Sequence, residues 1–288
     1  VDSEYKKDCR NIVESHLEIA QKALNEALEN KEFVDEVRSS ALAFSGEILI
    51  SHVMKYVLKS NGIKTDSVKF DDWPIITDNN IESTNFLSSE SRGKIQKIAE
   101  LVEENEVVTI GGFIGKTVDN ITTTFERGGS DRTAADLGIL FHKKYETSID
   151  FEKDSAVVSA DPKIVDVELR DVNQLSYNEA RLAGMFGMKI VDPIAIKEIL
   201  ENGVEIPLTI TNMQSPEMIT KIQRNPDDKS GHPLKIVTGK KNCAILRIES
   251  EMISDSQWED WGYVSQGNSS KSDDNSTFEY QGETSDSL

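Results

Sequence analysis

The stretch VVTIGGFIGKT, residues 107–117, and the stretch TTTFERGGSDRTA, residues 122–134, decide the fold of this 288-residue chain. A short apolar run leads into one glycine pair, and a second glycine pair comes just before a helix predicted from Ser130 to about Tyr145. Val107 to Ile110 is predicted to be a buried parallel strand, because it is short, mostly apolar and ends at glycines. This order of strand, glycine turn and helix is typical of an α/β protein.

Regular elements are predicted on both sides of this segment. Apolar residues at helical spacing predict helices over about 7–28, 42–60, 95–102, 177–186 and 193–202. Short strands are predicted at 148–151, 155–158 and 206–211. The alternation predicts a three-layer αβα sandwich with a largely parallel central sheet that is covered on both faces.

The composition bears on the class of partner. Acidic residues outnumber basic ones 51 to 32, which gives a formal net charge of −19 at pH 7. Such a surface repels phosphate backbones and anionic lipids, so neither nucleic acid nor membrane is expected as a partner. No apolar run approaches the roughly 20 residues of a membrane span, and no signal peptide is visible, so a cytoplasmic location is expected. Cys9, Cys243 and the scattered histidines lack metal-ligand spacing, and no metal is assigned to them.

The two glycine pairs predict an anion site that works against the overall charge. Glycines such as Gly112 and Gly115 allow the backbone to approach a ligand and to point its amides at it. Amides at the start of the following helix attract anions, and Arg127 just before it could clamp a carboxylate with two hydrogen bonds. Ser130 is a natural helix cap or a ligand donor, and Asp131 could order a cation or a catalytic lysine. The alternative is that Ser130 and Asp131 only cap the helix.

Three further charged residues are candidates for ligand binding. Glu47, in SGEILIS at 45–51, lies near the start of an apolar helix and could hold an ammonium group, or it is an ordinary acid at a helix start. Lys163 follows the Asp-Pro turn in SADPKIV at 159–165 and could reach a phosphate, or it is simply solvated. Lys189 lies in the otherwise apolar part of FGMKIVDP at 186–193, where a solvated lysine is less expected, so that a phosphate ligand and a solvated lysine are equally open.

These segments, in this order, resemble the aspartate kinase family. Its GFIG turn, TTxGRGGSDxTA segment, DPR turn and FGAKVLHP segment are similar to residues 112–115, 122–134, 161–163 and 186–193. The similarity covers roughly Ser45 to Met218, and residues 234–248 resemble the opening of the family's regulatory ACT module. The resemblance therefore implies a catalytic domain over 1–232 and the start of an ACT-like region over 233–253. The polar composition of residues 254–288 predicts a disordered acidic tail.

The resemblance also implies a reaction and a set of residue roles. The β-carboxylate of aspartate attacks the γ-phosphate of ATP with the help of Mg²⁺ and gives 4-phospho-aspartate, the first step toward lysine, threonine and methionine. Family members usually dimerise through their ACT modules, so a homodimer is a further implication. The implied substrate residues are Glu47, Arg127, Gly129 and Ser130. The implied nucleotide and transfer residues are Gly112, Gly115, Asp131, Lys163 and Lys189.

The chain also departs from the family pattern. The family's opening K-F-G-G-T-S strand has no counterpart, and its W-T-D-V-x-G segment reads FEKDSA at 151–156. Glu126, Val158, Lys163 and Asp192 replace a glycine, a tyrosine, an arginine and a histidine of the family's motifs. Three hypotheses therefore stand beside one another: an aspartate kinase, a non-catalytic amino-acid-binding or regulatory homologue, and a kinase for glutamate or for a nucleoside monophosphate.

Overall fold

The computed structural model consists of two units, Val1–Thr238 and Gly239–Leu288. It describes residues 1–32, 34–161, 165, 168–188, 190–226 and 234–239, together with the backbone of 264–265 and 278–279. In the second unit the described residues are the strands β9 (Val264–Ser265) and β10 (Phe278–Glu279), which pair antiparallel. Everything that follows concerns the first unit.

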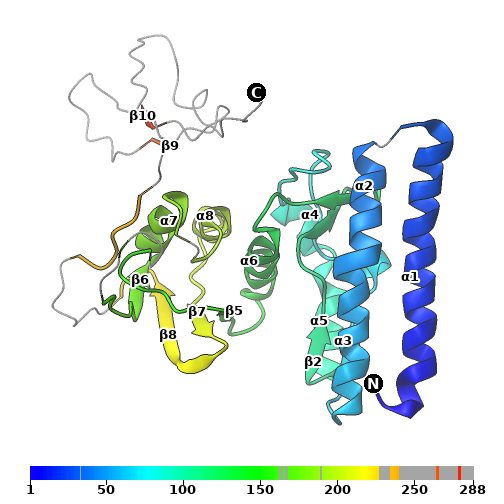
Figure 1. Ribbon diagram of the computed structural model, residues 1–288, viewed down its shortest axis with the longest axis horizontal. Coiled ribbons are helices and arrows are strands. Elements are labelled where there is room, and N and C mark those ends of the chain that lie inside the picture. Colours follow the sequence, from blue (N-terminus) through cyan, green and yellow to red (C-terminus); the bar gives the residue numbers. More distant parts are fainter. Residues whose placement is uncertain are drawn as a thin grey trace. The chain divides into compact units, whose positions relative to one another are not determined.

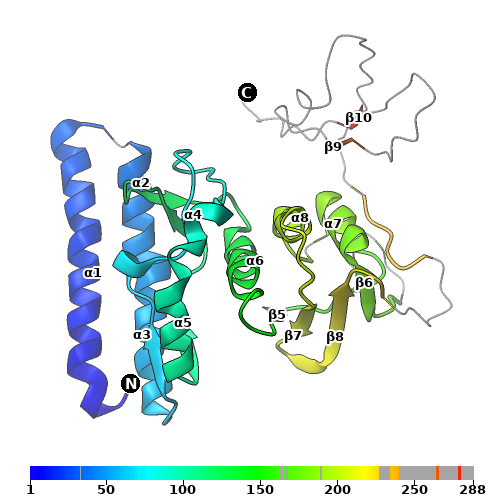
Figure 2. The ribbon, with the colours of Figure 1, turned by 180° about the vertical axis from the view of Figure 1, so that it is seen from behind.

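The first unit opens with a helical hairpin. Helix α1 (Ser3–Asn30) confirms the predicted helix and is longer than predicted, and it ends where Lys31 adopts a left-handed conformation with φ 56°. Helix α2 (Asp35–Leu42) runs through a π-helical turn (Ala43–Glu47) into α3 (Ile48–Ser60), so that α1 lies beside this continuous run (Figures 1 and 2). The predicted 42–60 helix is therefore confirmed at its end, whereas the helical run begins seven residues earlier, at Asp35. The π turn at its start was not predicted.

The helical run Asp35–Ser60 is long and apolar enough to cross a membrane by length and composition alone. Its most apolar 18-residue window has a mean hydropathy of 1.3, and 28% of that window is buried. This is weak evidence, since a core helix of a soluble protein passes the same test, and Ala43 and Ile48 from this run are fully buried in the core. No membrane span was predicted here because polar residues interrupt the apolar run. The absence of a membrane partner stays a prediction.

Two small pairs of strands follow. Strand β1 (Thr65–Ser67) pairs parallel with β2 (Val107–Thr109), and helices α4 (Ser88–Arg92) and α5 (Ile95–Glu104) lie between them in the chain. The predicted strand is thus parallel, but it is not fully buried, because Val107 is 37% exposed and β2 pairs only with β1 among the described residues. Strand β3 (Ile114–Lys116) pairs antiparallel with β4 (Thr122–Thr124) in a hairpin that was not predicted.

Helix α6 (Gly129–Phe141) leads to a four-stranded sheet with the order β5-β7-β8-β6. Strands β5 (Ile149–Lys153) and β7 (Leu208–Asn212) are parallel, as are β6 (Gln174–Ser176) and β8 (Ser215–Gln223). Strands β7 and β8 are antiparallel, because only two residues connect them. The sheets are therefore mixed rather than uniformly parallel, and the predicted α/β class is confirmed.

The remaining helices begin and end with the expected signals. Helix α7 (Tyr177–Met185) starts with a capping box between Ser176 and Glu179. Helix α8 (Pro193–Glu201) has Pro193 in its first turn, as predicted, and the Asp192 side chain caps it. The strand predicted at 155–158 is absent as a strand, because Val158 forms only an isolated bridge with Asp171.

Helix α6 is shared by two hydrophobic cores. Its residues Ala135 and Ile139 belong to the core that β5, β7, β8, α7 and α8 build. Its residue Leu140 belongs to the core around Trp73 and Ile114. A side-chain carbon at Gly138 would lie 2.8 Å from Ile149, so glycine there lets α6 pack closely on β5. The second half of α6 is consequently held from both sides.

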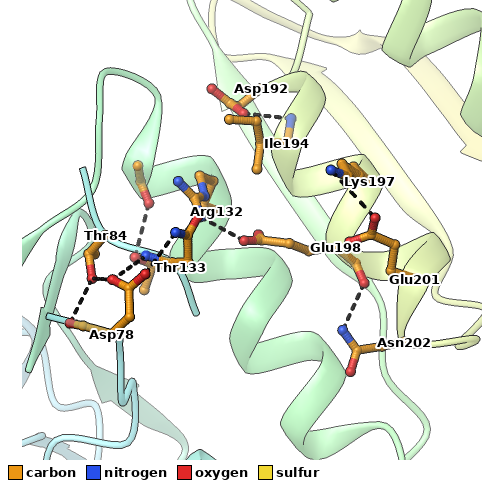
Figure 3. A network of polar contacts seen from close by, with 12 residues as sticks. Asp78, Thr84, Arg132, Thr133, Asp192, Ile194, Lys197, Glu198, Glu201 and Asn202 are labelled. Atoms are coloured by element: carbon orange, nitrogen blue, oxygen red, sulfur yellow. Dashed lines mark hydrogen bonds and ion pairs between the residues drawn. The ribbon is translucent and has the colours of Figure 1, made fainter. Parts of the chain in front are cut away.

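A buried ionic cluster holds α6 against α8 (Figure 3). Arg132 of α6 donates to Glu198 of α8 at 2.8 Å, and its guanidinium lies 4.4 Å from the centre of the Phe125 ring. Asp136 is fully buried beside them, and this desolvation, together with the charge of Glu198, raises its pKa well above the usual range. Burial also raises the pKa of Glu198. We infer that Asp136 keeps its proton, so that the guanidinium of Arg132 is paired with one carboxylate only, that of Glu198.

This cluster predicts a stability that falls as the pH rises. The folded pKa of Asp136 and of Glu198 is raised above the unfolded value, so the folded state loses its advantage as the pH passes from the ordinary carboxyl range through the raised pKa values. The Asp136→Asn variant keeps a hydrogen-bond donor at this position but removes the carboxyl group that titrates. We expect it to be more stable than the wild type at pH 8, by on the order of 1 kcal/mol, and to show a weaker pH dependence in thermal melts followed by circular dichroism.

The control is Glu103→Gln, which alters an exposed carboxyl that binds Lys144 and Tyr145. If the melting temperatures of the wild type and of Asp136→Asn fell equally with rising pH, the assignment of the proton to Asp136 would be contradicted.

A buried histidine predicts the opposite trend at acid pH. His52 of α3 bonds through Nδ1 to the Ser67 hydroxyl of β1, and its ring centre lies 4.9 Å from that of His16. Burial, and then the charge of His16, lowers the pKa of His52 to about 4. The unfolded state binds this proton first, so stability is lost as the pH falls from about 6.5 toward 4, by roughly 1.4 kcal/mol per pKa unit at most. An NMR ring resonance of His52 that titrates near pH 6.5 instead would refute this. His52→Gln should weaken the dependence of the melting temperature on pH below about 6.5.

Candidate functional site

The first glycine pair brings the predicted substrate residues together. A side-chain carbon at Gly111 would lie 2.7 Å from the backbone oxygen of Glu47, and one at Gly112 would lie 2.9 Å from the Ser130 side chain. Neither contact leaves room for any other residue. The glycine turn is therefore pressed between the π turn that ends at Glu47 and the first turn of α6. The close approach predicted for these glycines was toward a ligand and stays a prediction, whereas the close approach that the structure shows is toward Glu47 and Ser130.

The turn is also locked by hydrogen bonds. Phe113 has a positive φ of 68°, which is uncommon for a residue other than glycine. Its N–H donates to the Thr133 hydroxyl of α6 at 3.0 Å, and its carbonyl accepts from the N–H of Phe125 at 3.0 Å. The Thr133 hydroxyl in turn donates to the carbonyl of Gly129. These bonds hold the backbone in a conformation that would otherwise be unfavourable.

The second glycine pair is required by space as well as by conformation. Gly128 has a φ of 95°, and a side chain there would overlap the carboxylate of Asp192. A side chain at Gly129 would overlap Phe125 and Phe113. Gly128 is the N-cap of α6, and no side chain caps this helix, so the expectation that Ser130 caps it is wrong. Ser130 lies one residue inside the helix, and it is exposed.

Two charged candidates have no partner among the residues that the structure describes. Glu47 is partly buried, and desolvation raises the pKa of its carboxyl. The side chain of Arg127 is exposed, and no hydrogen bond or ion pair is found for it in the described ranges. A desolvated carboxylate without a partner favours the binding of a cation. A guanidinium that no protein carboxylate uses is available to an anionic ligand.

Asp131 is held by groups from three elements. Both of its oxygens accept from the Lys153 ammonium at the end of β5, at 2.9 and 3.0 Å. One of them also accepts the N–H of Asp192 at 3.1 Å, and the Asp192 carboxylate accepts from Ile194 in the first turn of α8 (Figure 3). Burial raises the pKa of Asp192. The starts of α6 and α8 and the carboxyl end of β5 thus meet at Asp131. The lysine that Asp131 contacts is Lys153, and whether this lysine is catalytic stays a prediction.

The end of the glycine motif supports the fold. Gly115 lies buried in β3, where a side chain would overlap Thr77 and Thr123. The next residue, Lys116, is buried, and its ammonium donates to the carbonyls of Phe70 and Asp71 at 3.1 and 2.9 Å. Desolvation lowers the pKa of this lysine. A packing reason thus exists for glycine at 115, and its role toward a nucleotide stays a prediction.

Two predicted residues, Lys163 and Lys189, lie outside the residues that the structure describes. Most of the predicted ACT-like region, 233–253, also lies outside them. Two residues at the site were not singled out, namely Lys153 and the Asp192 cap. A cap signal existed in the sequence, since aspartate directly before proline marks a helix start. A lysine at the end of a short strand carries no comparable signal.

The described residues offer binding groups of both signs. Glu47 suits an ammonium group, and Arg127, Ser130 and the start of α6 suit a carboxylate or a phosphate. No group of three or more His, Cys, Asp or Glu side chains that could hold a metal ion is found within the described part.

The sequence is similar to known proteins over most of its length. The model of the amino acid kinase family matches residues 2–212. The aspartokinase of Rickettsia felis is 27% identical over 213 residues, which cover 73% of this chain and 50% of that protein. The bifunctional aspartokinase/homoserine dehydrogenase 2 of Arabidopsis thaliana is 28% identical over 235 residues, covering 79% of this chain and 25% of that protein. The chain thus spans a quarter to a half of the length of these relatives.

The fold agrees with solved structures as well. The structure of E. coli aspartokinase III in complex with aspartate and ADP superposes with a TM-score of 0.64, covers 76% of this chain and 47% of that one, and is 19% identical. At this identity the superposition supports the fold alone. Because the family model matches well over half of the residues, the chain belongs to the amino acid kinase family.

Proposed function

We propose that this chain carries the kinase part of an aspartokinase, which transfers the γ-phosphate of ATP to the β-carboxylate of aspartate. The observation that carries the proposal is the contact of the Gly111–Gly112 turn with Glu47 on one side and with Ser130 on the other. This contact sets the backbone of Glu47, a residue whose carboxyl is desolvated, and the start of a helix on the two sides of one glycine turn. The opposite preferences of these groups match the ammonium and the carboxylate of an α-amino acid.

Each end of the amino acid has a group of suitable chemistry. Glu47 would accept hydrogen bonds from the substrate ammonium, and this contact would supply the cation that its desolvated carboxylate lacks. Arg127 would hold the α-carboxylate in a bidentate pair, with the Ser130 hydroxyl as a further donor. A nucleoside monophosphate offers no ammonium group for Glu47, which favours an amino acid. The length of the acid side chain, aspartate or glutamate, is assigned from the named relatives.

The transfer step requires positioning and charge neutralisation rather than a covalent nucleophile. A β-carboxylate oxygen forms the bond to the γ-phosphorus, the bond from phosphorus to the bridging oxygen breaks, and ADP leaves with that electron pair. No proton moves. Asp131 would organise the cation at this point, and Lys163 and Lys189 would contact the nucleotide phosphates. Mg²⁺ would arrive with ATP and take oxygens from the phosphates.

Arg127→Ala should weaken the binding of aspartate more than the binding of ATP. Removal of a bidentate guanidinium should raise the KM for aspartate by at least about tenfold, with a small effect on the KM for MgATP. Arg127→Lys should recover only part of the loss, since an ammonium cannot form the same pair. A coupled ADP-release assay or a hydroxamate trap of the acyl phosphate measures both constants.

The matched control is Arg10→Ala, an exposed arginine on α1. Absence of turnover with aspartate, or an Arg127→Ala variant that behaves like Arg10→Ala, would reject the proposed function.

The pH dependence of aspartate binding should follow Glu47. Its pKa is raised, so it takes up a proton at a higher pH than an ordinary carboxylate, and its grip on the ammonium is lost as the pH falls through that value. We expect kcat/KM for aspartate in the wild type to decline as the pH falls, starting at a higher pH than an ordinary carboxyl would give, and to be lower and flat across the same range in Glu47→Gln. A parallel decline in both proteins would assign the titration to another group.

A second candidate function follows from the segment FEKDSA at 151–156, which replaces the family's W-T-D-V-x-G segment. Loss of that segment is expected of an amino-acid-binding or regulatory homologue that has given up phosphoryl transfer. That alternative predicts calorimetric binding of aspartate without binding of MgATP, whereas the kinase predicts both. The domain boundaries after residues 232 and 253, the homodimer and the cytoplasmic location remain proposals that come from the resemblance and the composition.

A further inference from the structure

We propose that Lys153 is a catalytic residue that neutralises the transferred γ-phosphoryl group and that Asp131 orients it for this purpose. The proposal rests on the proposed function, because it concerns the same transfer site. It assigns the cation to a residue that neither the glycine motifs nor the resemblance singled out.

The ammonium of Lys153 is held in a defined direction. Lys153 ends β5 on the side where this strand and the parallel β7 present their carboxyl ends, which is the edge where α/β proteins bind ligands. Its Nζ donates to both oxygens of Asp131, at 2.9 and 3.0 Å, and lies 5.6 Å from the centre of the Phe151 ring. Asp131 is itself fixed by the N–H of Asp192. Such a bidentate contact orients the lysine rather than only attracting it.

One hydrogen of this ammonium is left for a ligand. An ammonium group has three donors, and Asp131 uses two of them. Within the described ranges no other polar partner of Nζ is found, and 29% of the Lys153 side chain is exposed. A structural ion pair between α6 and β5 would need neither this exposure nor the open donor. An anion that approaches the pair can therefore take the third hydrogen while the lysine stays on Asp131.

The surroundings favour an oxyanion at this point. The amino-terminal ends of α6 and α8 both meet the pair, and each end carries a partial positive charge. On a chain with a net charge of −19, a triphosphate needs a local cation to bind at all. In the transfer step, Lys153 would donate a hydrogen bond to a non-bridging γ-oxygen and keep its proton, while the β-carboxylate oxygen bonds to phosphorus and ADP departs with the electron pair.

Calorimetry with and without the γ-phosphate tests the role. We expect Lys153→Met to weaken binding of magnesium adenylyl-imidodiphosphate by at least about tenfold, to change MgADP less than about threefold, and to leave aspartate unchanged. Turnover should fall at least about a hundredfold. Lys153→Arg should restore part of the triphosphate affinity. The matched control is Lys144→Met, which removes another lysine–carboxylate pair, that with Glu103 beyond the end of α6.

The outcomes separate this proposal from the proposed function. Equal affinity of the wild type and Lys153→Met for the triphosphate analogue, or an equal loss for the triphosphate and for ADP, overturns the role of Lys153. A wild type that binds no triphosphate overturns it as well. If the wild type phosphorylates aspartate in these cases, the proposed function stands. If the wild type neither binds nor phosphorylates aspartate, the proposed function fails, whatever the analogue shows. Circular dichroism of each variant confirms that it is folded.

Discussion

The contact between a bare backbone turn and two neighbouring elements is the constraint on which the site depends. Gly111 and Gly112 touch the end of the π turn and the start of α6 at distances that exclude a side-chain carbon. The same turn contains a left-handed Phe113 that Thr133 and Phe125 hold in place. A substitution in this turn would therefore move Glu47 away from Ser130 before it changed any charged group. The chemistry of the site is set by backbone packing first and by side chains second.

The second glycine pair applies the same principle to the other end of the site. Gly128 leaves space for the Asp192 carboxylate, which caps α8, while the N–H of Asp192 binds Asp131 in the first turn of α6. The starts of the two helices are thereby joined through one aspartate. The buried cluster of Arg132, Asp136 and Glu198 fixes the same two helices further along. Positive helix ends are held together here by carboxylates of the protein itself.

Much of the fold could be predicted from the sequence, because its longer helices carry a strong period and clear caps. The helices at 7–28, 177–186 and 193–202 were recovered nearly to their ends. The strands were recovered less well, since β1, β3, β4 and β6 have three residues each and no pattern of length three is informative. The antiparallel β7–β8 pair was not predicted, because its two-residue turn, Met213–Gln214, lacks the glycine, asparagine or aspartate that usually marks a hairpin.

Several residues of the candidate site could be predicted from the sequence, but the contacts between them could not. Glu47, Gly112, Ser130 and Asp131 were named from residue type and spacing, and the structure places the Gly111–Gly112 turn between the backbone of Glu47 and the side chain of Ser130. The partner of Asp131 was not predictable, because Lys153 lies 22 residues away along the chain and reaches Asp131 only through the packing of β5 beside α6. The capping role expected of Ser130 failed for a local reason, since the helix starts one residue earlier, at Gly129.

The position of α6 between two cores has a consequence for how the molecule comes apart. Ala135 and Ile139 are buried in one core and Leu140 in the other, so neither core can open without loosening the helix on which the other rests. The first unit should therefore lose its structure in one cooperative step rather than lobe by lobe. In that case the amide hydrogens of α6 would exchange with solvent only when the whole unit unfolds.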